Sequence, residues 1–543
     1  MVVEVSKSLC DQNPRLLEWH SFTAREDDRF LSQGDPRFLL VLVHHNLGAC
    51  SCLVKLEEEN MRKAKIVCTI GPASDSLMSL DRLIEHGMDA ARLNFSHGTH
   101  EWHGRTIKTI REAAARRQVA VAIIQDLQGP RIRVGDLGDG GIEVTTGQSV
   151  RLQTVLARSG GRLGASSIVA SDIAEIPITY QYLVRDVQPG ARILIDDGLI
   201  ELVVNRISGG VVECTVATGG RITSQKGINL PGTRVSAPTL TEKDREDIRF
   251  GVAAGVDYLA LSFVRGPEDV AAAKQVVAEC AGDVPIIAKI ERSEAVNALT
   301  GILDQADGVM IARGDLGVEM GPEAVPILQK RIIAEANRRR RLVITATQML
   351  ESMTQRTSPT RAEASDVANA VFDGTDAVML SAETAIGQHP VETVRVMDRI
   401  IRAAEEGIEP SFAHRRGADH GEVSCSEAIC TAGFTAAAAI TASAIVAFSE
   451  LGLTARLISK QRPAAPIIAF TPFEPIRHRM ALYWGVIPHT MQQIAHTDER
   501  VDEAERRLKA EGLVKSGQRI VILSGTRIGQ PGHTNLMKLH EVE

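Results

Sequence analysis

Short apolar runs alternate with longer amphipathic stretches from residue 65 to residue 407. Such runs are typical of buried strands, and apolar side chains spaced three or four residues apart are typical of the helices that cover them. The predicted strands are residues 65–70, 90–94, 119–126, 258–262, 285–290, 308–312, 342–346 and 377–380. Because helical patterns separate them, the chain is predicted to form a closed α/β barrel of eight βα units, a TIM barrel.

The alternation is interrupted once and is followed by a second pattern. Residues 130–238 hold short alternating runs with frequent glycine, which predict an inserted all-β domain. Beyond residue 408, apolar runs at 444–448, 466–470 and 519–524 accompany helical stretches and predict a doubly wound α/β domain. We therefore expect a barrel domain at 61–129 and 239–407, the inserted domain at 130–238 and a C-terminal domain at 408–543.

Residues 1–60 show no clean periodicity. Met61 stands just before the first predicted strand, where a start codon would be expected. We expect residues 1–60 to be an N-terminal extension, either disordered or the product of a mis-assigned start. A targeting segment remains open as the alternative.

Composition narrows the class of protein. The 543 residues carry a net charge of −7, with 44% hydrophobic and 24% charged residues, which is typical of a soluble globular protein. The negative charge and the 3% aromatic content argue against nucleic-acid binding, and the basic run 338–341 is explained by its place at a helix C-terminus. No stretch predicts a membrane span or secretory signal, and eight scattered cysteines favour a reducing, cytoplasmic compartment.

The strongest chemical signal is the stretch PIIAKIERSEAVNALTGILDQADGVMIARGDLGVE, residues 285–319. One predicted strand ends with Lys289 and Glu291, and the next ends with Arg313 and Asp315. Two carboxylates beside a lysine can hold a divalent metal and an anionic substrate together. Salt bridges at the loop ends are the simpler alternative.

The carboxyl ends of other predicted strands add polar groups to the same mouth of the barrel. They are Arg92, Asn94, Ser96, Asp126, Arg131, Arg133, Thr345, Thr347, Ser381 and Glu383. Lysine and arginine neutralise phosphoryl oxygens, carboxylates bind Mg²⁺ or Mn²⁺, and a hydroxyl can pass a proton. The pattern indicates a site for a phosphorylated acid.

Several motifs together resemble the pyruvate kinase family from about Arg62 to the C-terminus. They are KIVCTIGPAS, ARLNFSHG, KGINLPG, AKIE, MIARGDLGVE, ITATQMLESM, PTRAEASDVANAV and MLSAETA. The resemblance implies transfer of the phosphoryl group of phosphoenolpyruvate to ADP, giving ATP and pyruvate in the last step of glycolysis. It also implies that the inserted domain is a β-barrel lid, that the C-terminal domain is regulatory and that the chain forms a homotetramer.

The resemblance also implies roles for individual residues. Glu291 and Asp315 would hold Mg²⁺ or Mn²⁺, and Lys289 would stabilise the phosphoryl group in flight. Arg92 would contact phosphate, while the backbone of Gly314 and Asp315, together with Thr347, would hold the substrate carboxylate. Thr347 and Ser381 would form the proton route, supported by Glu383. The nucleotide would lie along Thr69, Pro72, Arg133 and Lys226. Arg313 is then expected to have a structural role, and His97 is expected to support residues of the site without contacting the substrate itself.

One departure from the common family pattern concerns K⁺. Asn94, Ser96, Asp126 and Leu127 match the K⁺ ligand pattern, but Arg131 stands where many members carry glutamate. A guanidinium there can supply the positive charge itself. The chain thus resembles the K⁺-independent, bacterial-type branch, and K⁺ is predicted not to be required.

The stretch SELGLTARLISK matches the family's effector loop. Ser449, Gly452 and Thr454, with Arg527 from a second loop, predict a site for a phosphorylated effector whose identity the sequence does not give. Two alternatives to a kinase remain open: a Mg²⁺-dependent lyase or aldolase on a related barrel, and a catalytically inactive regulatory homologue.

Overall fold

The structure is a computed structural model that describes residues 61–138, 140–154, 173–408, 423–494, 496–526 and 533–543. Nearer the N-terminus it describes the backbone of three strands, β1 (Phe30–Leu31), β2 (Phe38–His45) and β3 (Gly48–Lys55). They pair antiparallel in the order β1-β2-β3, within a unit separate from residues 62–543. The sequence pattern did not predict these strands, and the origin expected for residues 1–60 stays a prediction.

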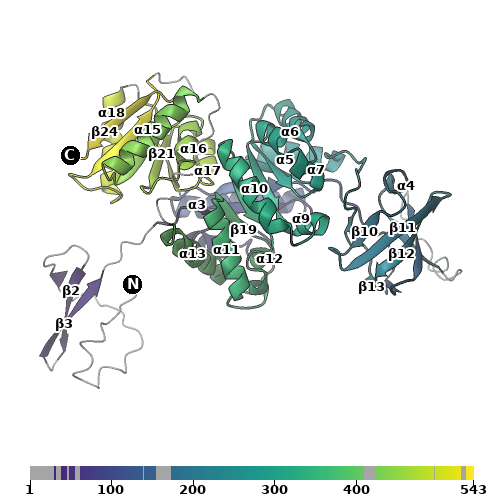
Figure 1. The fold of residues 1–543 in the computed structure, drawn as a ribbon. Helices are drawn as coiled ribbons and strands as arrows, with labels where there is room; N and C mark the ends of the chain where they lie inside the picture. The colour runs from purple at the N-terminus through teal and green to yellow at the C-terminus, as the bar shows by residue number, and fades with distance from the viewer. Residues whose placement is uncertain are drawn as a thin grey trace. The chain divides into compact units, whose positions relative to one another are not determined.

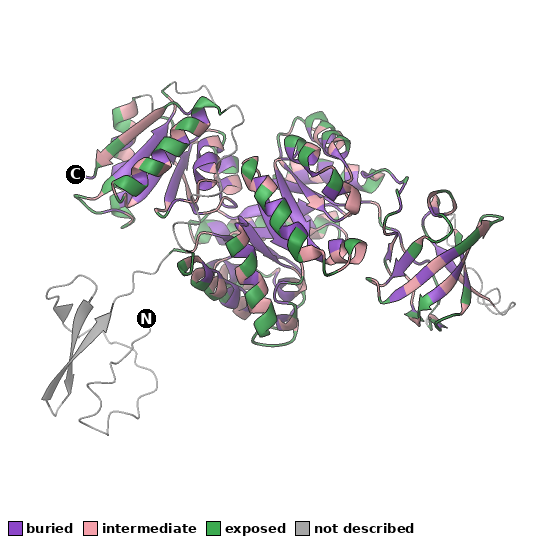
Figure 2. Ribbon diagram, in the orientation of Figure 1, coloured by how far each residue is buried: buried purple, intermediate pink, exposed green. Residues whose placement is uncertain are grey.

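The predicted barrel is confirmed (Figure 1). Eight parallel strands close in the order β15-β16-β17-β18-β19-β4-β5-β6. Their bounds are β4 (Lys65–Thr69), β5 (Ala90–Asn94), β6 (Ala122–Asp126), β15 (Tyr258–Leu261), β16 (Ile286–Ile290), β17 (Gly308–Ala312), β18 (Leu342–Ala346) and β19 (Ala377–Leu380). Almost every strand residue is buried, as parallel strands covered on both faces require (Figure 2).

Helices cover the outside of the barrel. They are α2 (Leu77–Glu85), α3 (His100–Arg116), α5 (Glu242–Ala254), α6 (Pro267–Glu279), α7 (Ser293–Asn297), α8 (Leu299–Gln305), α9 (Arg313–Met320), α10 (Val325–Arg338), α11 (Arg361–Asp373), α12 (Ala382–Ala385) and α13 (Pro390–Glu406). Thr241 and Thr360 start α5 and α11 with capping boxes, and Gly255 and Gly374 end them in the left-handed conformation. These local signals explain why the sequence located both helices.

The inserted domain is a curled mixed sheet with its own apolar core. Six strands lie in the order β14-β10-β11-β12-β8-β9, and β13 pairs with β7. The bounds are β7 (Ile142–Val144), β8 (Ser149–Thr154), β9 (Ala174–Ile178), β10 (Arg192–Ile195), β11 (Ile200–Ser208), β12 (Val211–Thr218), β13 (Gly220–Ile222) and β14 (Ile228–Asn229). The all-β prediction missed the short helix α4 (Leu183–Asp186). Bridges from Arg133 and Val134 link the two edges of the sheet.

The C-terminal domain has a five-stranded sheet in the order β22-β21-β20-β23-β24. Its elements are α15 (Cys425–Ala439), β20 (Ala444–Phe448), α16 (Leu453–Ser459), β21 (Ile467–Thr471), α17 (Glu474–Met480), β22 (Val486–Thr490), α18 (Thr497–Ala510), β23 (Arg519–Ser524) and β24 (Leu536–Glu541). Apolar clusters lie on both faces of the sheet, as in a doubly wound fold, although the edge strand β24 runs antiparallel. Within the described residues, no helix has the length and apolar character needed to cross a membrane.

Candidate active site

A cavity of about 390 Å³ lies at the carboxyl ends of the barrel strands, partly lined by residues of the inserted domain. It brings together many of the residues predicted from the sequence: Arg92, Asn94, Ser96, Asp126, Leu127, Arg131, Arg133, Lys226, Lys289, Glu291 and Asp315. They come from positions up to 223 residues apart, since the first is Arg92 and the last Asp315. The closed barrel places these strand ends side by side, as expected.

Lys289, near the end of β16, is the central cation of the cavity. Its Nζ lies 2.8 Å from Glu291 Oε1 and 3.3 Å from Asp126 Oδ1, and it donates to Ser262 Oγ at 2.8 Å. Burial works against the charge, but Asp126 and Glu291 raise the pKa of this ammonium above its ordinary value. Lys289 therefore stays protonated at neutral pH, with its charge aimed at the cavity.

Asp126, at the end of β6, is held by two cations and a hydroxyl. Arg92 Nε donates to its Oδ2 at 2.7 Å, and Ser262 Oγ lies 3.4 Å from its Oδ1. Burial opposes ionisation, yet Lys289 and Arg92 lower the pKa of this carboxyl. Ser262 Oγ also donates to Leu127 O at 2.7 Å. The oxygens of Asp126 and Leu127 thus already receive hydrogen bonds from protein donors.

Glu291 and Asp315 are the candidate metal ligands. Burial, and then the neighbouring charge of Glu291, raise the pKa of Asp315 to about 7. Two carboxylates that repel each other in a buried site fit a divalent cation, which would relieve that repulsion. No group of three or more His, Cys, Asp or Glu side chains in the described part of the chain could hold a metal. Protein carboxylates would therefore need oxygens from a substrate or water to complete the coordination.

Thr347 follows β18 in the left-handed conformation, with φ of 67°. Its Oγ1 accepts from Gly314 N at 2.8 Å and donates to Ala346 O at 2.6 Å. A β-branched residue at positive φ is strained, and such strain is characteristic of functional sites. Arg313 Nη2 donates to Thr347 O at 2.7 Å, and its Nη1 lies 2.6 Å from Asp366 Oδ2. These contacts give Arg313 the structural position that the sequence suggested.

Ser381 and Glu383 follow β19. Glu383 is fully buried and accepts from Ser381 N at 2.6 Å and from Leu350 N at 3.1 Å. Burial raises the pKa of its carboxyl. Ser381 Oγ is buried and has no hydrogen-bond partner among the described residues. A buried hydroxyl without a protein partner suits a site where substrate or water completes its bonding.

The four candidate nucleotide residues are not all brought together. Lys226 Nζ lies 2.9 Å from Asp196 Oδ1, and Arg133 Nη1 donates to Gln225 O at 2.6 Å; both residues line the cavity from the inserted domain and its hinge. Thr69 is buried and donates to Leu380 O, while Pro72 is exposed. Neither Thr69 nor Pro72 is among the residues that line this cavity.

The predicted effector loop borders a small cavity of about 70 Å³ in the C-terminal domain, lined by Ser449 and Thr454 among others. Ser449 Oγ accepts from Thr454 N at 3.2 Å, and Thr454 Oγ1 bonds Thr534 Oγ1 at 2.7 Å. Gly452 lies in this loop at φ of 78°. Arg527 lies outside the described residues, so the fourth predicted effector residue stays a prediction.

Sequence reasoning missed Ser262, which follows β15 and bonds Lys289. The rule that identified the other residues, a polar side chain directly after a barrel strand, would have found it.

Sequence reasoning also missed Arg265, which donates to Val235 O at 2.6 Å and to Thr239 Oγ1 at 2.7 Å. Arg265 ties the hinge of the inserted domain to the barrel, and no local pattern indicates that contact.

A closed (β/α)₈ barrel with carboxylates, arginines and a lysine at its mouth defines the class of barrel enzymes that act on anionic substrates. Comparison with known proteins is more specific. Residues 61–394 match the pyruvate kinase barrel domain, and residues 427–540 match the pyruvate kinase alpha/beta domain. The chain belongs to the pyruvate kinase family.

Individual relatives agree. The chain is 46% identical over 484 residues to a pyruvate kinase of Geobacillus stearothermophilus, covering 89% of this chain and 80% of that protein. It is 44% identical to a pyruvate kinase of Staphylococcus aureus, with 89% and 81% covered. A crystal structure of a pyruvate kinase from Cryptosporidium parvum superposes with a TM-score of 0.83 at 38% identity, covering 89% of this chain and 96% of that one.

Proposed function

We propose that this chain transfers the phosphoryl group of phosphoenolpyruvate to ADP, forming ATP and pyruvate. The observation that carries the proposal is Lys289, a buried ammonium held between Asp126 and Glu291 in the cavity that Asp315 also lines. Membership of the pyruvate kinase family supports it. A loose phosphoryl transition state needs positive charge and positioning more than covalent chemistry, and this cavity offers both.

The residues at the mouth of the barrel have different roles in the proposed reaction. The bond between the enol oxygen and phosphorus breaks while a new bond forms to a terminal oxygen of ADP, and Lys289 and Arg92 neutralise the transferring oxygens. Glu291 and Asp315 would hold Mg²⁺ or Mn²⁺, which supplies additional positive charge to substrate oxygens when bound. The backbone of Gly314 and Asp315, together with Thr347, holds the substrate carboxylate. The remaining enolate takes a proton on its methylene carbon through Thr347 and Ser381, with Glu383 fixing the Ser381 backbone.

The inserted domain acts as a lid in this proposal. Arg133 and Lys226 bring the nucleotide to the cavity from the lid side, and Thr69 and Pro72 extend the nucleotide site on the barrel side. Two arginines tie the segment that returns from the inserted domain, residues 233–239, to the barrel. Arg265 donates to Val235 O, and Arg292 donates to Thr233 O at 2.9 Å. Closure over the mouth would exclude water from the phosphoryl group.

We also propose that activity does not require K⁺. Arg131 lines the cavity at an exposed position, where partial desolvation together with the neighbouring Arg133 lowers the pKa of its guanidinium, while Asp315 and Asp126 act in the opposite direction. Arg131 would supply these carboxylates with the positive charge that K⁺ otherwise brings. Asp126 and Leu127 already accept from Arg92 and Ser262. An assay in Tris buffer free of Na⁺ and K⁺ tests this, and a gain of about tenfold or more on adding KCl contradicts it.

Three further properties complete the proposal. A phosphorylated effector binds the loop of Ser449, Gly452 and Thr454; titration calorimetry with sugar phosphates and AMP tests this, and no heat from any of them contradicts it. The chain assembles as a homotetramer and works in the cytoplasm, as the family resemblance implies. Sedimentation velocity measures the assembly.

The central experiment is a coupled assay of ATP formed from phosphoenolpyruvate, ADP and Mg²⁺. Steady ATP formation supports the proposal. Cleavage or condensation of pyruvate without ATP would instead support the lyase or aldolase alternative, and no turnover with intact folding would support an inactive regulatory homologue.

A further inference from the structure

Four aspartates stand at the amino end of the barrel, directly before every second strand. Asp89, Asp257, Asp307 and Asp376 precede β5, β15, β17 and β19. Each carboxylate accepts a backbone N–H from the preceding strand in the barrel order: Ile66 at 2.8 Å, Ile123 at 2.7 Å, Ile286 at 3.0 Å and Val343 at 2.8 Å. Each aspartate therefore fixes the start of one strand against the start of its neighbour.

Two of the four carboxylates lie against side chains of the C-terminal domain, and a third is connected to that domain through a lysine of the barrel. Asp376 binds Lys460 and Arg462, which follow α16, and Asp257 Oδ1 lies 3.7 Å from His478 Nδ1 of α17. Asp89 reaches the domain through Lys65. The fourth, Asp307, pairs instead with Lys274 of the barrel helix α6, at 3.1 Å. Asp376 thus pairs directly with cations of the C-terminal domain, whereas Asp307 pairs with a lysine of the barrel and serves as the comparison.

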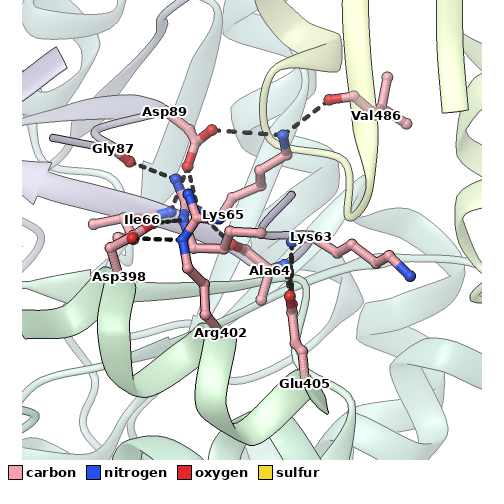
Figure 3. A network of polar contacts seen from close by, with 11 residues as sticks. Lys63, Ala64, Lys65, Ile66, Gly87, Asp89, Asp398, Arg402, Glu405 and Val486 are labelled. Carbon is pink, nitrogen blue, oxygen red and sulfur yellow. Dashed lines mark hydrogen bonds and ion pairs between the residues drawn. The ribbon is translucent and has the colours of Figure 1, made fainter. Parts of the chain in front are cut away.

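Figure 3 shows the contacts of Asp89, one of the four aspartates at the amino end of the barrel. Lys65 Nζ lies 3.5 Å from Asp89 Oδ1 and donates to Val486 O, in β22 of the C-terminal domain, at 2.9 Å. Arg62 bridges Asp89 and Asp398 of α13, at 2.8 Å from each. The lysine and the aspartate are thus fixed from both domains.

The Asp376 part is the most enclosed. The Lys460 and Asp376 side chains are only 2% and 1% exposed, and Lys460 Nζ also donates to Asn337 Oδ1 at 2.8 Å. Burial, together with Arg462 and Arg456, outweighs Asp376 and lowers the pKa of Lys460 to about 8. Since the charged form is disfavoured in this place, the ammonium adds little net stability. What Lys460 does provide is a fixed position for the Asp376 carboxylate and for Asn337.

Asp376 links the two strands whose far ends carry the proposed proton route. Val343 of β18 donates to the Asp376 carboxylate, and Asp376 N donates to Val343 O at 3.0 Å. At the other end, β18 leads to Thr347 and β19 to Ser381. Strand β18 has five residues, so it spans about 16 Å, and it lies in a closed, fully hydrogen-bonded barrel. A shift of one strand start is therefore passed along to its end.

We propose that Lys460 is a positioning residue through which the C-terminal domain sets the alignment of β18 and β19, and thereby of Thr347 and Ser381. The inference rests on the proton roles proposed above for these two hydroxyls. The contacts of Lys460 and Arg462 with Asp376 would therefore affect the proton-transfer step, whether or not an effector is bound.

The test measures exchange of the methyl protons of pyruvate in D₂O by proton NMR, which reports the proton step alone, beside steady-state ATP formation. Lys460→Met is compared with Lys460→Arg and with the matched control Lys274→Met, all in the full chain. We expect Lys460→Met to lower the exchange rate about fivefold or more, and Lys460→Arg and Lys274→Met to stay within about twofold of the parent. Melting temperatures establish that each variant is folded.

Several outcomes would overturn the inference. Equal effects of Lys460→Met and Lys274→Met, or a lower melting temperature with unchanged exchange, would leave Lys460 a purely structural residue. Thr347→Val separates the two proposals: if it leaves exchange intact, the assigned proton route fails; if it abolishes exchange while Lys460→Met does not alter it, only the positioning role fails.

A second measurement does not depend on folding of Lys460→Met. The charged groups that face Lys460 are Asp376, Arg462 and Arg456. Lysine loses its charge above about pH 8 while arginine keeps it, so the exchange rate of Lys460→Arg relative to the parent should rise about threefold between pH 7 and pH 9. A constant ratio contradicts the proposal.

Discussion

At the scale of single residues, the site depends on a balance of buried charges. Lys289 pairs with Asp126 and Glu291, and Arg92 pairs with Asp126, so that the pKa of the Asp126 carboxyl is lowered despite its burial. Asp315 forms no ion pair with another described residue, and burial, followed by the charge of Glu291, raises its pKa to about 7. This uneven balance indicates where a divalent cation and a phosphoryl group would be attracted.

Removal of the central cation gives the first prediction. Lys289→Met should lower kcat for ATP formation by at least about 100-fold, because the transferring oxygens lose their closest fixed charge. Circular dichroism and the melting curve should show that the fold is kept. The exposed ion-pair variant Lys330→Met serves as control and should retain normal turnover. Near-normal turnover of Lys289→Met would refute its assigned role.

A charge reversal at residue 131 gives the second prediction. Arg131→Glu should be poorly active without K⁺ and should regain about tenfold or more on adding KCl, because a carboxylate in place of the guanidinium leaves the cavity short of positive charge. Arg131→Lys, which keeps the charge, should respond to K⁺ no more than the parent does. The measurement is kcat for ATP formation as a function of KCl in Tris buffer. An Arg131→Glu variant indifferent to K⁺ would contradict the proposal.

At the scale of elements, helices outside the barrel fix the turns that carry the site. His103 of α3 stacks on Phe95 at 3.8 Å between ring centroids, and its Nε2 bonds His97 O at 2.9 Å. Lys243 of α5 donates to Phe95 O at 2.8 Å. The turn that carries Asn94 and Ser96 is therefore held from behind by two helices.

The burial of His103 gives a prediction about pH. Burial lowers its pKa from the ordinary 6.5 to about 4, so between these pH values the unfolded chain binds more protons than the folded one. Stability from this residue is present above pH 6.5 and is lost as the pH falls toward 4, by about 2 kcal/mol between pH 7 and pH 5. His103→Gln should show a smaller fall in unfolding free energy over this range, measured by urea denaturation. An identical fall in both proteins would contradict it.

At the scale of the whole molecule, the barrel and the C-terminal domain share one interior. Ala481 and Leu482, which follow α17, belong to the apolar cluster that fills the barrel, together with Tyr258, Ile344 and other inward residues. Tyr258 Oη donates to Arg479 O at 2.8 Å across the same junction. The C-terminal domain thus closes the amino end of the barrel with apolar side chains inside the ring of aspartates.

This shared interior predicts coupled unfolding. Leu482 is fully buried, so Leu482→Ala should cost about 2–5 kcal/mol through lost burial and the cavity left behind. Calorimetry should show the barrel and C-terminal transitions lowered together. Leu539→Ala, at a half-exposed position, is the control and should change stability little. A shift confined to one domain would show that the interior is not shared energetically.

Much of the fold could be predicted because its signals are local. The apolar runs located all eight barrel strands, and capping residues such as Thr241 and Gly255 mark the ends of α5 in the structure. The rule of polar side chains at strand ends found Lys289, Glu291 and Asp315, which line one cavity. The same rule applied to the opposite strand ends would have drawn attention to the four aspartates, each of which directly precedes an apolar run.

By itself, the sequence determined the order of elements, the barrel and many of the residues that line the cavity at its mouth, because these follow from short-range periodicity and from the geometry of parallel strands. It also carried the family motifs. Only the tertiary structure decided which polar groups pair: Ser262 with Lys289, Arg265 with the hinge, and Lys460 with Asp376. Such partners lie far apart in the chain, and the free energy of a buried charge depends on neighbours that folding alone brings together.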